Sequence, residues 1–284
     1  MNTLLKKIFI NQPTKWGKGI PVLWAGMDIN LYLKSFLINK NYFFTKNQFP
    51  FESARAAIYH YLKYKRIENG DEVIITCFTC DAVTKAVKAS GAKIIYCDIN
   101  DNLSMNFEDI LNKINIKTKL IICQNSFGIK GLSLNELKQI NDLKIPVLLD
   151  NCLSFGTVYQ KKYIDLFDAE VYSFEVSKVI CIGWGGMIQI KNPNNFMSYY
   201  DSLDSVSVLE DLRRIFQTIL NLLFVGKGNL ITKFLWYFFM ISGIFKKSTS
   251  LSKNFNKSKK LGKLSKKILS NVIQSRDEIF LKTK

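Results

Sequence analysis

The chain has 284 residues, of which 48% are hydrophobic and 13% aromatic, so it can bury a substantial core and is not a disordered protein. Its formal net charge is +17, and residues 201–284 hold a surplus of ten positive charges, from 16 Lys and Arg against 6 Asp and Glu. The first 200 residues are therefore only mildly basic. The basic segment has no recognition motif and its aromatic residues are separate from its lysines, so we expect no nucleic-acid partner.

Six cysteines lie mostly within or beside apolar runs, and the N-terminal stretch LLKKIFI is too short for a cleavable signal peptide. These features predict a reducing, cytoplasmic setting. Cys77 and Cys80 form one CxxC pair, which a redox site or half of a zinc site would require. No second pair exists and the one histidine, His60, falls in a predicted helix, so we expect no metal site.

Helical and strand patterns alternate through the first two thirds of the chain. They predict a helix at 53–65, a strand at 72–76, a helix near 82–89, a strand at 93–99, a helix near 106–114, a strand at 119–124, a helix at 133–140 and a strand at 146–150. Strands that are apolar on both faces and separated by single helices indicate an α/β fold with a mainly parallel sheet covered by helices. We divide the chain into an N-terminal segment (1–50), a large domain (51–195) and a helical, lysine-rich C-terminal region (196–284).

The C-terminal region contains the apolar stretch FLWYFFMISGIF at 234–245, which is shorter than the ~20 residues needed to span a bilayer. Nine lysines and no acidic residue follow it at 246–267. Two interpretations stay open. The stretch is either a core helix of a reduced small domain, or an anchor at a membrane surface whose lysines attract anionic lipid.

In a parallel sheet, ligands bind outside the carboxyl ends of the strands, where polar residues follow apolar runs. Asp150 ends the run IPVLLD, and Lys178 follows the run VYSF. A lone lysine at such a place is usually a solvated surface group, but a carboxylate and an amine together suit pyridoxal 5'-phosphate. The amine condenses with the cofactor aldehyde, and the carboxylate keeps the pyridine nitrogen protonated.

A phosphate site is also needed, and the start of the helix at 53–65 provides one. The backbone N–H groups of Ala54 and Arg55 lie at the positive end of the helix dipole, where phosphate groups bind well. Ser173 can add a hydroxyl group from the end of its apolar run.

Five blocks of sequence resemble, in order and spacing, the DegT/StrS-type sugar aminotransferases: ESARAAIYHYL, GDEVIITCFTCDAV, GAKIIYCDI, LLDNCLSFG and YSFEVSKVICIGWGGMI. The resemblance implies the type I aminotransferase fold. It makes Lys178 the residue bonded to the cofactor, Asp150 the partner of the pyridine nitrogen, and Ser173, with the amides of Ala54 and Arg55, the phosphate ligands. Cys80 occupies the position where an aromatic residue often stacks on the pyridine ring.

The resemblance also implies a function, the transfer of an amino group, commonly from glutamate, to a keto-sugar attached to a nucleotide. The amino sugar would serve a cell-surface polysaccharide such as lipopolysaccharide. Such enzymes are usually homodimers with the site at the subunit interface, and peripheral contact with an anionic membrane would suit this role.

Some positions depart from the family pattern. Leu153 replaces a common glutamine, Trp184 replaces the usual glutamate of the glycine turn, and a later block with an asparagine and an arginine has no counterpart. These departures leave an alternative, a non-catalytic binding or membrane-scaffold protein on a degenerate aminotransferase fold. A dehydratase of the same fold is disfavoured because it typically replaces the lysine with histidine, and Lys178 is retained.

Overall fold

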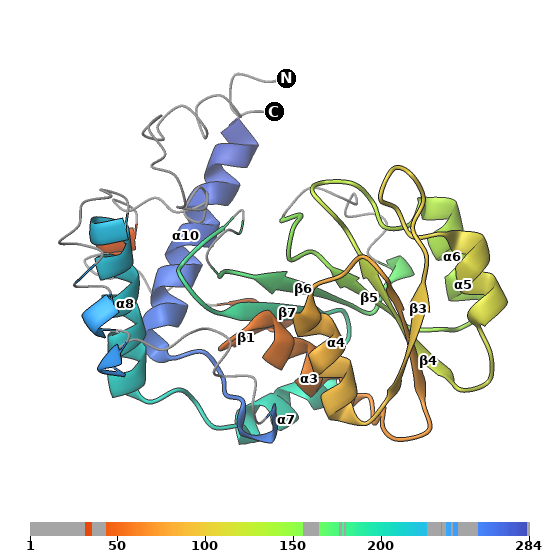
Figure 1. The fold of residues 1–284 in the computed structure, drawn as a ribbon, viewed down its shortest axis with the longest axis horizontal. Helices are drawn as coiled ribbons and strands as arrows, with labels where there is room; N and C mark the ends of the chain where they lie inside the picture. The colour runs from red at the N-terminus through yellow and green to blue at the C-terminus, as the bar shows by residue number, and fades with distance from the viewer. Residues whose placement is uncertain are drawn as a thin grey trace.

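The computed structural model describes residues 32–35, 44–155, 165–175, 178, 180–225, 234, 237–239, 241–243 and 255–282. Within them one seven-stranded sheet has the strand order β1-β7-β6-β5-β4-β2-β3 (Figure 1). The strands are β1 (Gln48–Phe51), β2 (Glu72–Thr76), β3 (Lys93–Cys97), β4 (Thr118–Gln124), β5 (Val147–Asp150), β6 (Ala169–Ser173) and β7 (Gly186–Ile190). The α-helices are α3 (Ala54–Tyr64), α4 (Asp81–Ser90), α5 (Phe107–Lys113), α6 (Leu134–Asp142), α7 (Asn194–Ser202), α8 (Val208–Val225) and α10 (Lys263–Lys282).

The sheet is mainly parallel. Strands β3, β2, β4, β5 and β6 run in one direction, and each neighbouring pair among them is parallel. Strand β7 is antiparallel to both β6 and β1. The predicted α/β class is thus confirmed. The antiparallel direction of β7 was not predicted. A glycine-rich connection joins β6 to β7 directly, whereas a parallel neighbour would need a crossover connection such as a helix.

Helices cover both faces of the sheet, and the alternation of side chains along each strand explains how. On β2, Val73 and Ile75 belong to the core cluster that includes α3 and α4, whereas Ile74 belongs to the cluster that includes α5 and α6. Successive side chains of a strand point to opposite faces, so a strand covered twice must be apolar throughout. This requirement is the reason that the strands read as continuous apolar runs in the sequence.

The C-terminal helices α8 and α10 pack against each other at the β1 side of the sheet (Figure 1). The segment before α10 is joined to β1 by two backbone hydrogen bonds, from Leu261 N to Pro50 O (3.1 Å) and from Glu52 N to Lys259 O (3.0 Å). A third core cluster combines side chains of β7, α8 and α10, including Met187, Ile215 and Ile268. The large domain and these helices therefore share buried apolar contacts.

The apolar stretch at 234–245 lies partly outside the described residues. Among its described side chains, Phe239 is half-buried, whereas the large apolar side chains of Phe234, Tyr237, Phe238 and Ile241 are exposed. None of the described helices is both long enough and apolar enough to cross a membrane.

His60 joins α3 to the C-terminal region. Its Nε2 lies 3.2 Å from the carbonyl oxygen of Ser258, which can only accept, so Nε2 carries the proton. Its Nδ1 lies 2.8 Å from the Tyr199 hydroxyl group, which therefore donates to it. Burial disfavours the charged imidazolium and lowers the pKa of His60 to about 4.

We expect this histidine to make the protein less stable in mild acid. Because the folded-state pKa of His60 is about 4 and the unfolded value about 6.5, the unfolded chain binds more protons between these values. The free energy of unfolding should fall by about 2 kcal/mol between pH 7 and pH 5 through this one group. Urea unfolding at the two pH values measures the loss.

The matched variant is His60→Gln, which keeps a polar side chain and does not titrate. His60 is the chain's one histidine, and the buried carboxyl groups of Glu52 and Glu170, whose pKa values burial raises, act in the opposite sense in both proteins. The difference in stability between wild type and variant should therefore shrink from pH 7 to pH 5. Parallel stability curves for the two proteins would contradict the account.

Candidate active site

A cavity of about 200 Å³ opens at the carboxyl ends of β2, β4 and β5. Its described lining residues are Phe78, Thr79, Cys80, Gln124, Phe127, Asp150, Cys152, Leu153 and Lys178. Three of the predicted site residues, Asp150, Lys178 and Cys80, thus lie around one space. The acid comes from the end of β5, the amine from the segment after β6, and the thiol from the turn between β2 and α4.

Asp150 is buried, with 3% of its surface exposed. Burial raises the pKa of its carboxyl group, while hydrogen bonds from Cys152 and the positive charge of Lys178 act to lower it. One of these bonds runs from the backbone N–H of Cys152 to Asp150 Oδ1 at 2.9 Å. A carboxylate in such a place needs cationic or hydrogen-bonding partners, and the cavity is where a further partner can reach it.

Lys178 is half-buried, and its backbone N–H donates to the carbonyl oxygen of Glu175 at 3.2 Å. The carboxylate of Glu175 pairs in turn with the Arg55 guanidinium group at 3.2 Å. This ion pair ties the segment that carries Lys178 to the first turn of α3. The lysine is thereby held near the predicted phosphate site.

The other predicted cofactor residues, Ala54, Arg55 and Ser173, lie at the start of α3 and the end of β6 rather than among the described lining of the cavity. Ser53 is the N-cap residue of α3, and its Oγ accepts from Ala56 N at 3.2 Å. The N–H groups of Ala54 and Arg55 fall in the first turn, where a helix offers no partner of its own.

Gly186 brings these residues close together. It pairs with Ser173 on β6 and with Phe51 on β1, and a Cβ atom on Gly186 would lie 2.1 Å from the backbone nitrogen of Ala54. The absence of a side chain lets Ser173 and the start of α3 approach each other. The resulting group of a hydroxyl and two backbone amides in the first turn of a helix can bind a phosphate.

Phe78 lies two positions before Cys80, in the turn that follows the end of β2 at Thr76, and both side chains line the cavity. Gln124 supports this turn, because its Nε2 donates to Phe78 O at 3.0 Å and its Oε1 accepts from Thr79 Oγ1 at 2.6 Å. Phe78 is thus the aromatic side chain beside Cys80, the position predicted for ring stacking.

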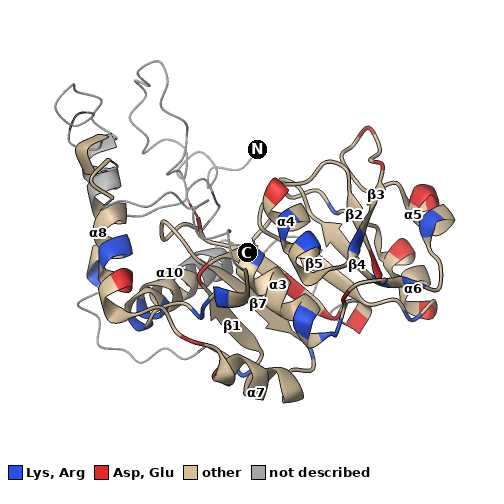
Figure 2. Cartoon of the chain, turned by 60° about the horizontal axis from the view of Figure 1, so that its bottom comes forward, with Lys and Arg blue, Asp and Glu red and all other residues tan. Residues whose placement is uncertain are grey.

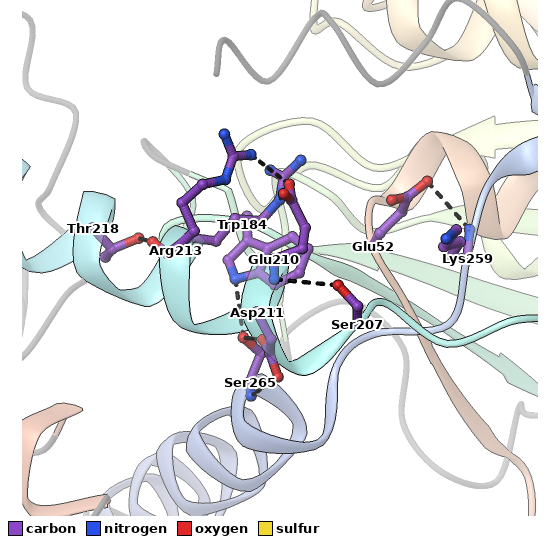
Figure 3. A network of polar contacts seen from close by, with 10 residues as sticks. Glu52, Trp184, Ser207, Glu210, Asp211, Arg213, Thr218, Lys259 and Ser265 are labelled. Atoms are coloured by element: carbon purple, nitrogen blue, oxygen red, sulfur yellow. Dashed lines mark hydrogen bonds and ion pairs between the residues drawn. The ribbon is translucent and has the colours of Figure 1, made fainter. Parts of the chain in front are cut away.

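Trp184 occupies the glycine turn where the family usually has glutamate, and it faces the C-terminal helices (Figure 3). The guanidinium carbon of Arg214 lies 4.5 Å from the ring centroid, and the indole N–H donates to Ser265 Oγ at 3.0 Å. Gly183, with φ of 88°, would meet Thr218 of α8 at 2.3 Å if it carried a Cβ. Helices α8 and α10 therefore hold the turn that follows Lys178.

Cys77 and Cys80 are both exposed free thiols, and Cys80 precedes α4 without a side-chain capping bond. Within the described part of the chain no three His, Cys, Asp or Glu side chains are grouped as a metal ion would need.

Comparison with protein families gives a match over residues 40–217 to the DegT/DnrJ/EryC1/StrS aminotransferase family. This region is more than half of the chain. The chain belongs to this family. The resemblance predicted from five sequence blocks is thus confirmed, and with it membership of a class of aminotransferases that bind pyridoxal phosphate.

Curated relatives include the GDP-perosamine synthases of Escherichia coli O157:H7 and Vibrio cholerae, which are 34% and 31% identical over 125 residues. Each match covers 43% of this chain and 34% of the relative, so the match spans about a third of the relatives' length. Among solved structures, NtdA of Bacillus subtilis with bound cofactor PMP is 22% identical, with a TM-score of 0.57 over 70% of this chain and 52% of that chain. An aminotransferase of Psychrobacter cryohalolentis is 23% identical, with a TM-score of 0.51 over 56% of this chain and 42% of that chain.

The residues present fit the cofactor of this family. A buried carboxylate and a lysine line one cavity, Phe78 offers a ring face, and the first turn of α3 lies beside the hydroxyl-bearing Ser173. We therefore assign the cavity and the start of α3 as the candidate cofactor site.

We expect Gly186→Ala to damage this site. The added methyl group would meet backbone atoms of Ala54 and Ser53, which cannot rotate away, so β7 or the start of α3 must move. Overpacking of this kind costs about 1–3 kcal/mol, and a displaced helix start should also weaken binding of pyridoxal phosphate about tenfold or more. Thermal unfolding and fluorescence titration with the cofactor measure the two effects.

Gly70→Ala is the control, because Gly70 has φ of 97° and no atom within 4 Å of an added Cβ. It should cost about 1 kcal/mol through backbone strain and leave cofactor affinity unchanged. Equal cofactor affinity in wild type and Gly186→Ala would show that the start of α3 does not hold the phosphate.

Proposed function

We propose that this chain is a pyridoxal-phosphate-dependent aminotransferase that moves an amino group from glutamate onto a keto-sugar carried by a nucleotide. The observation that supports this most directly is the common cavity of Asp150 and Lys178. The two side chains lie 28 positions apart in sequence, yet the sheet brings both to one edge.

The chemistry divides among a few residues. When bound, pyridoxal phosphate supplies an aldehyde that takes up the amino group and a protonated ring that accepts the electron pair released at the donor carbon. The carboxylate of Asp150 would keep the proton on the ring nitrogen. The amine of Lys178 would bind the aldehyde until the donor displaces it, and would then carry the proton from the donor carbon to the cofactor carbon as general base and general acid.

The remaining residues orient the cofactor. The amides of Ala54 and Arg55 and the hydroxyl group of Ser173 would bind its phosphate, and Cys80 and Phe78, which line the cavity, would contact the ring. Leu153 adds an apolar side chain to the lining, and a less polar surrounding strengthens the interaction of Asp150 with a protonated ring.

The names of the curated relatives, GDP-perosamine synthases, support a sugar nucleotide as the amino acceptor. We further propose that the product serves a cell-surface polysaccharide such as lipopolysaccharide, and that the enzyme works as a homodimer in the cytoplasm. Peripheral contact with an anionic membrane, expected from the lysines at 246–267, is independent of this chemistry.

Two departures from the family pattern favour the second candidate, a non-catalytic binding or scaffold protein. Leu153, which replaces a common glutamine, lines the cavity and offers no hydrogen bond to a ring or substrate. Trp184, which replaces the usual glutamate, is engaged by Arg214 and Ser265 instead. A protein of this kind would bind the cofactor without turning over an amino donor.

Absorbance of the purified protein with pyridoxal phosphate separates the candidates. We expect a band near the edge of the visible range that glutamate bleaches, and we expect Lys178→Ala to abolish the band. Loss of the proton-transferring amine should slow amino transfer by about 10²–10⁴-fold. Lys191→Ala, which alters the lysine that follows β7, is the control and should behave as wild type.

A band that persists in the Lys178→Ala variant would show that another amine holds the cofactor. A band that depends on Lys178 but resists every amino donor would favour the non-catalytic candidate.

A further inference from the structure

Helix α8 exposes apolar side chains to solvent in addition to those that it buries in the core. Its exposed large side chains are apolar and lie along one strip of the helix: Val208, Leu209, Leu212 and Phe216. Leu209, with 79% of its surface exposed, is the extreme case. A surface helix of a globular protein normally turns apolar side chains to the core and polar ones to water.

The charged side chains of α8 face the protein instead. Arg214 is buried against Trp184, and its Nε donates to Glu210 Oε1 at 3.1 Å. Arg213 pairs with the same carboxylate oxygen at 2.5 Å, and Asp211 is buried with 1% exposure (Figure 3). The charged side chains of α8 thus make contacts within the fold. The large side chains that α8 exposes to solvent are the apolar ones.

A basic segment lies beside the start of this strip. Asp211 Oδ2 accepts from the backbone N–H of Leu264 at 2.9 Å, which places the first turn of α10 against the first turn of α8. Residues 257–267 (KSKKLGKLSKK) contain six lysines and no acidic residue. Figure 2 shows basic residues around the start of α10, beside α8. Apolar and cationic groups therefore occur together at this end of the molecule.

We propose that the apolar strip of α8 and the neighbouring lysines form a surface that rests on an anionic lipid bilayer. Apolar side chains enter the boundary between headgroups and acyl chains, and lysines beside them are attracted to anionic headgroups. A contiguous apolar surface on a soluble fold indicates an interaction site. This surface is separate from the cofactor cavity, so the proposal does not depend on the chemistry proposed there.

A second copy of the chain fits this surface less well than a bilayer. A two-fold interface sets the same patch of both copies face to face, which would bring the two lysine-rich segments near each other. Like charges at an interface disfavour association, whereas an anionic membrane offers the opposite charge over its whole area.

Flotation of the full chain with phosphatidylcholine vesicles, with and without phosphatidylserine, tests the proposal. We expect the protein to float with the vesicles that contain phosphatidylserine and to lose most of this binding in the variant Leu209→Ser/Leu212→Ser. Replacing Lys257 and Lys263, both exposed, with glutamine should weaken binding about fivefold for each lysine.

Ile116→Ser is the matched control, because Ile116 is an apolar side chain that is 90% exposed and precedes β4, on another part of the fold. It should bind vesicles as wild type does. Phe216→Ser gives a second, single change in the strip, and unchanged thermal unfolding and cofactor absorbance show that each variant is folded.

Two results would overturn the proposal. The first is vesicle binding that does not change, either when phosphatidylserine is left out of the vesicles or when the α8 variants replace the wild type. The second is concentration-dependent self-association of the wild type in sedimentation without vesicles that the α8 variants abolish, which would make the strip an interface between copies.

Discussion

The burial of the Asp150 carboxylate at the end of β5 is the constraint on which the site depends. An ionised carboxylate removed from water is costly unless cations or hydrogen bonds compensate it. Here the compensation comes from Cys152 and the charge of Lys178, and the cavity leaves room for one more partner. A protonated ring nitrogen is a partner of the required charge, so the electrostatics of this sheet edge and the chemistry of the family agree.

The surrounding strands and helices approach each other closely and so bring the other site residues to the side of Asp150. The carboxyl ends of three parallel strands supply the cavity walls, and the antiparallel return through Gly186 brings Ser173 to the start of α3. The ion pair of Arg55 with Glu175 then connects the phosphate end of the site to the segment with Lys178. Helices α8 and α10 hold the far side of that segment through Trp184, which explains why the C-terminal region shares a core with the large domain.

The strands and the edge of the sheet that carries the site could be predicted from the sequence, because both depend on short, local patterns of residues. Strands buried on both faces read as apolar runs, and polar residues that end such runs, Asp150 and the residues before Lys178, mark the binding edge. The place of Phe78 in the cavity lining was not predicted, because it depends on where β2 ends, which neighbouring elements decide. The contacts of Trp184 join residues far apart in sequence. The exposed apolar strip of α8 could not be predicted either, because it depends on the buried contacts of Arg214 and Asp211 on the same helix.

The most direct measurement of the central claim is the position of the cofactor on the chain. Treatment of the protein and pyridoxal phosphate with borohydride fixes the bond between them, and mass spectrometry of the digested chain locates it. The account predicts one modified peptide, the one that contains Lys178, and loss of the modification when Asp150→Asn weakens the hold on the ring. Modification of another lysine, or an even spread over the many lysines of the chain, would contradict it.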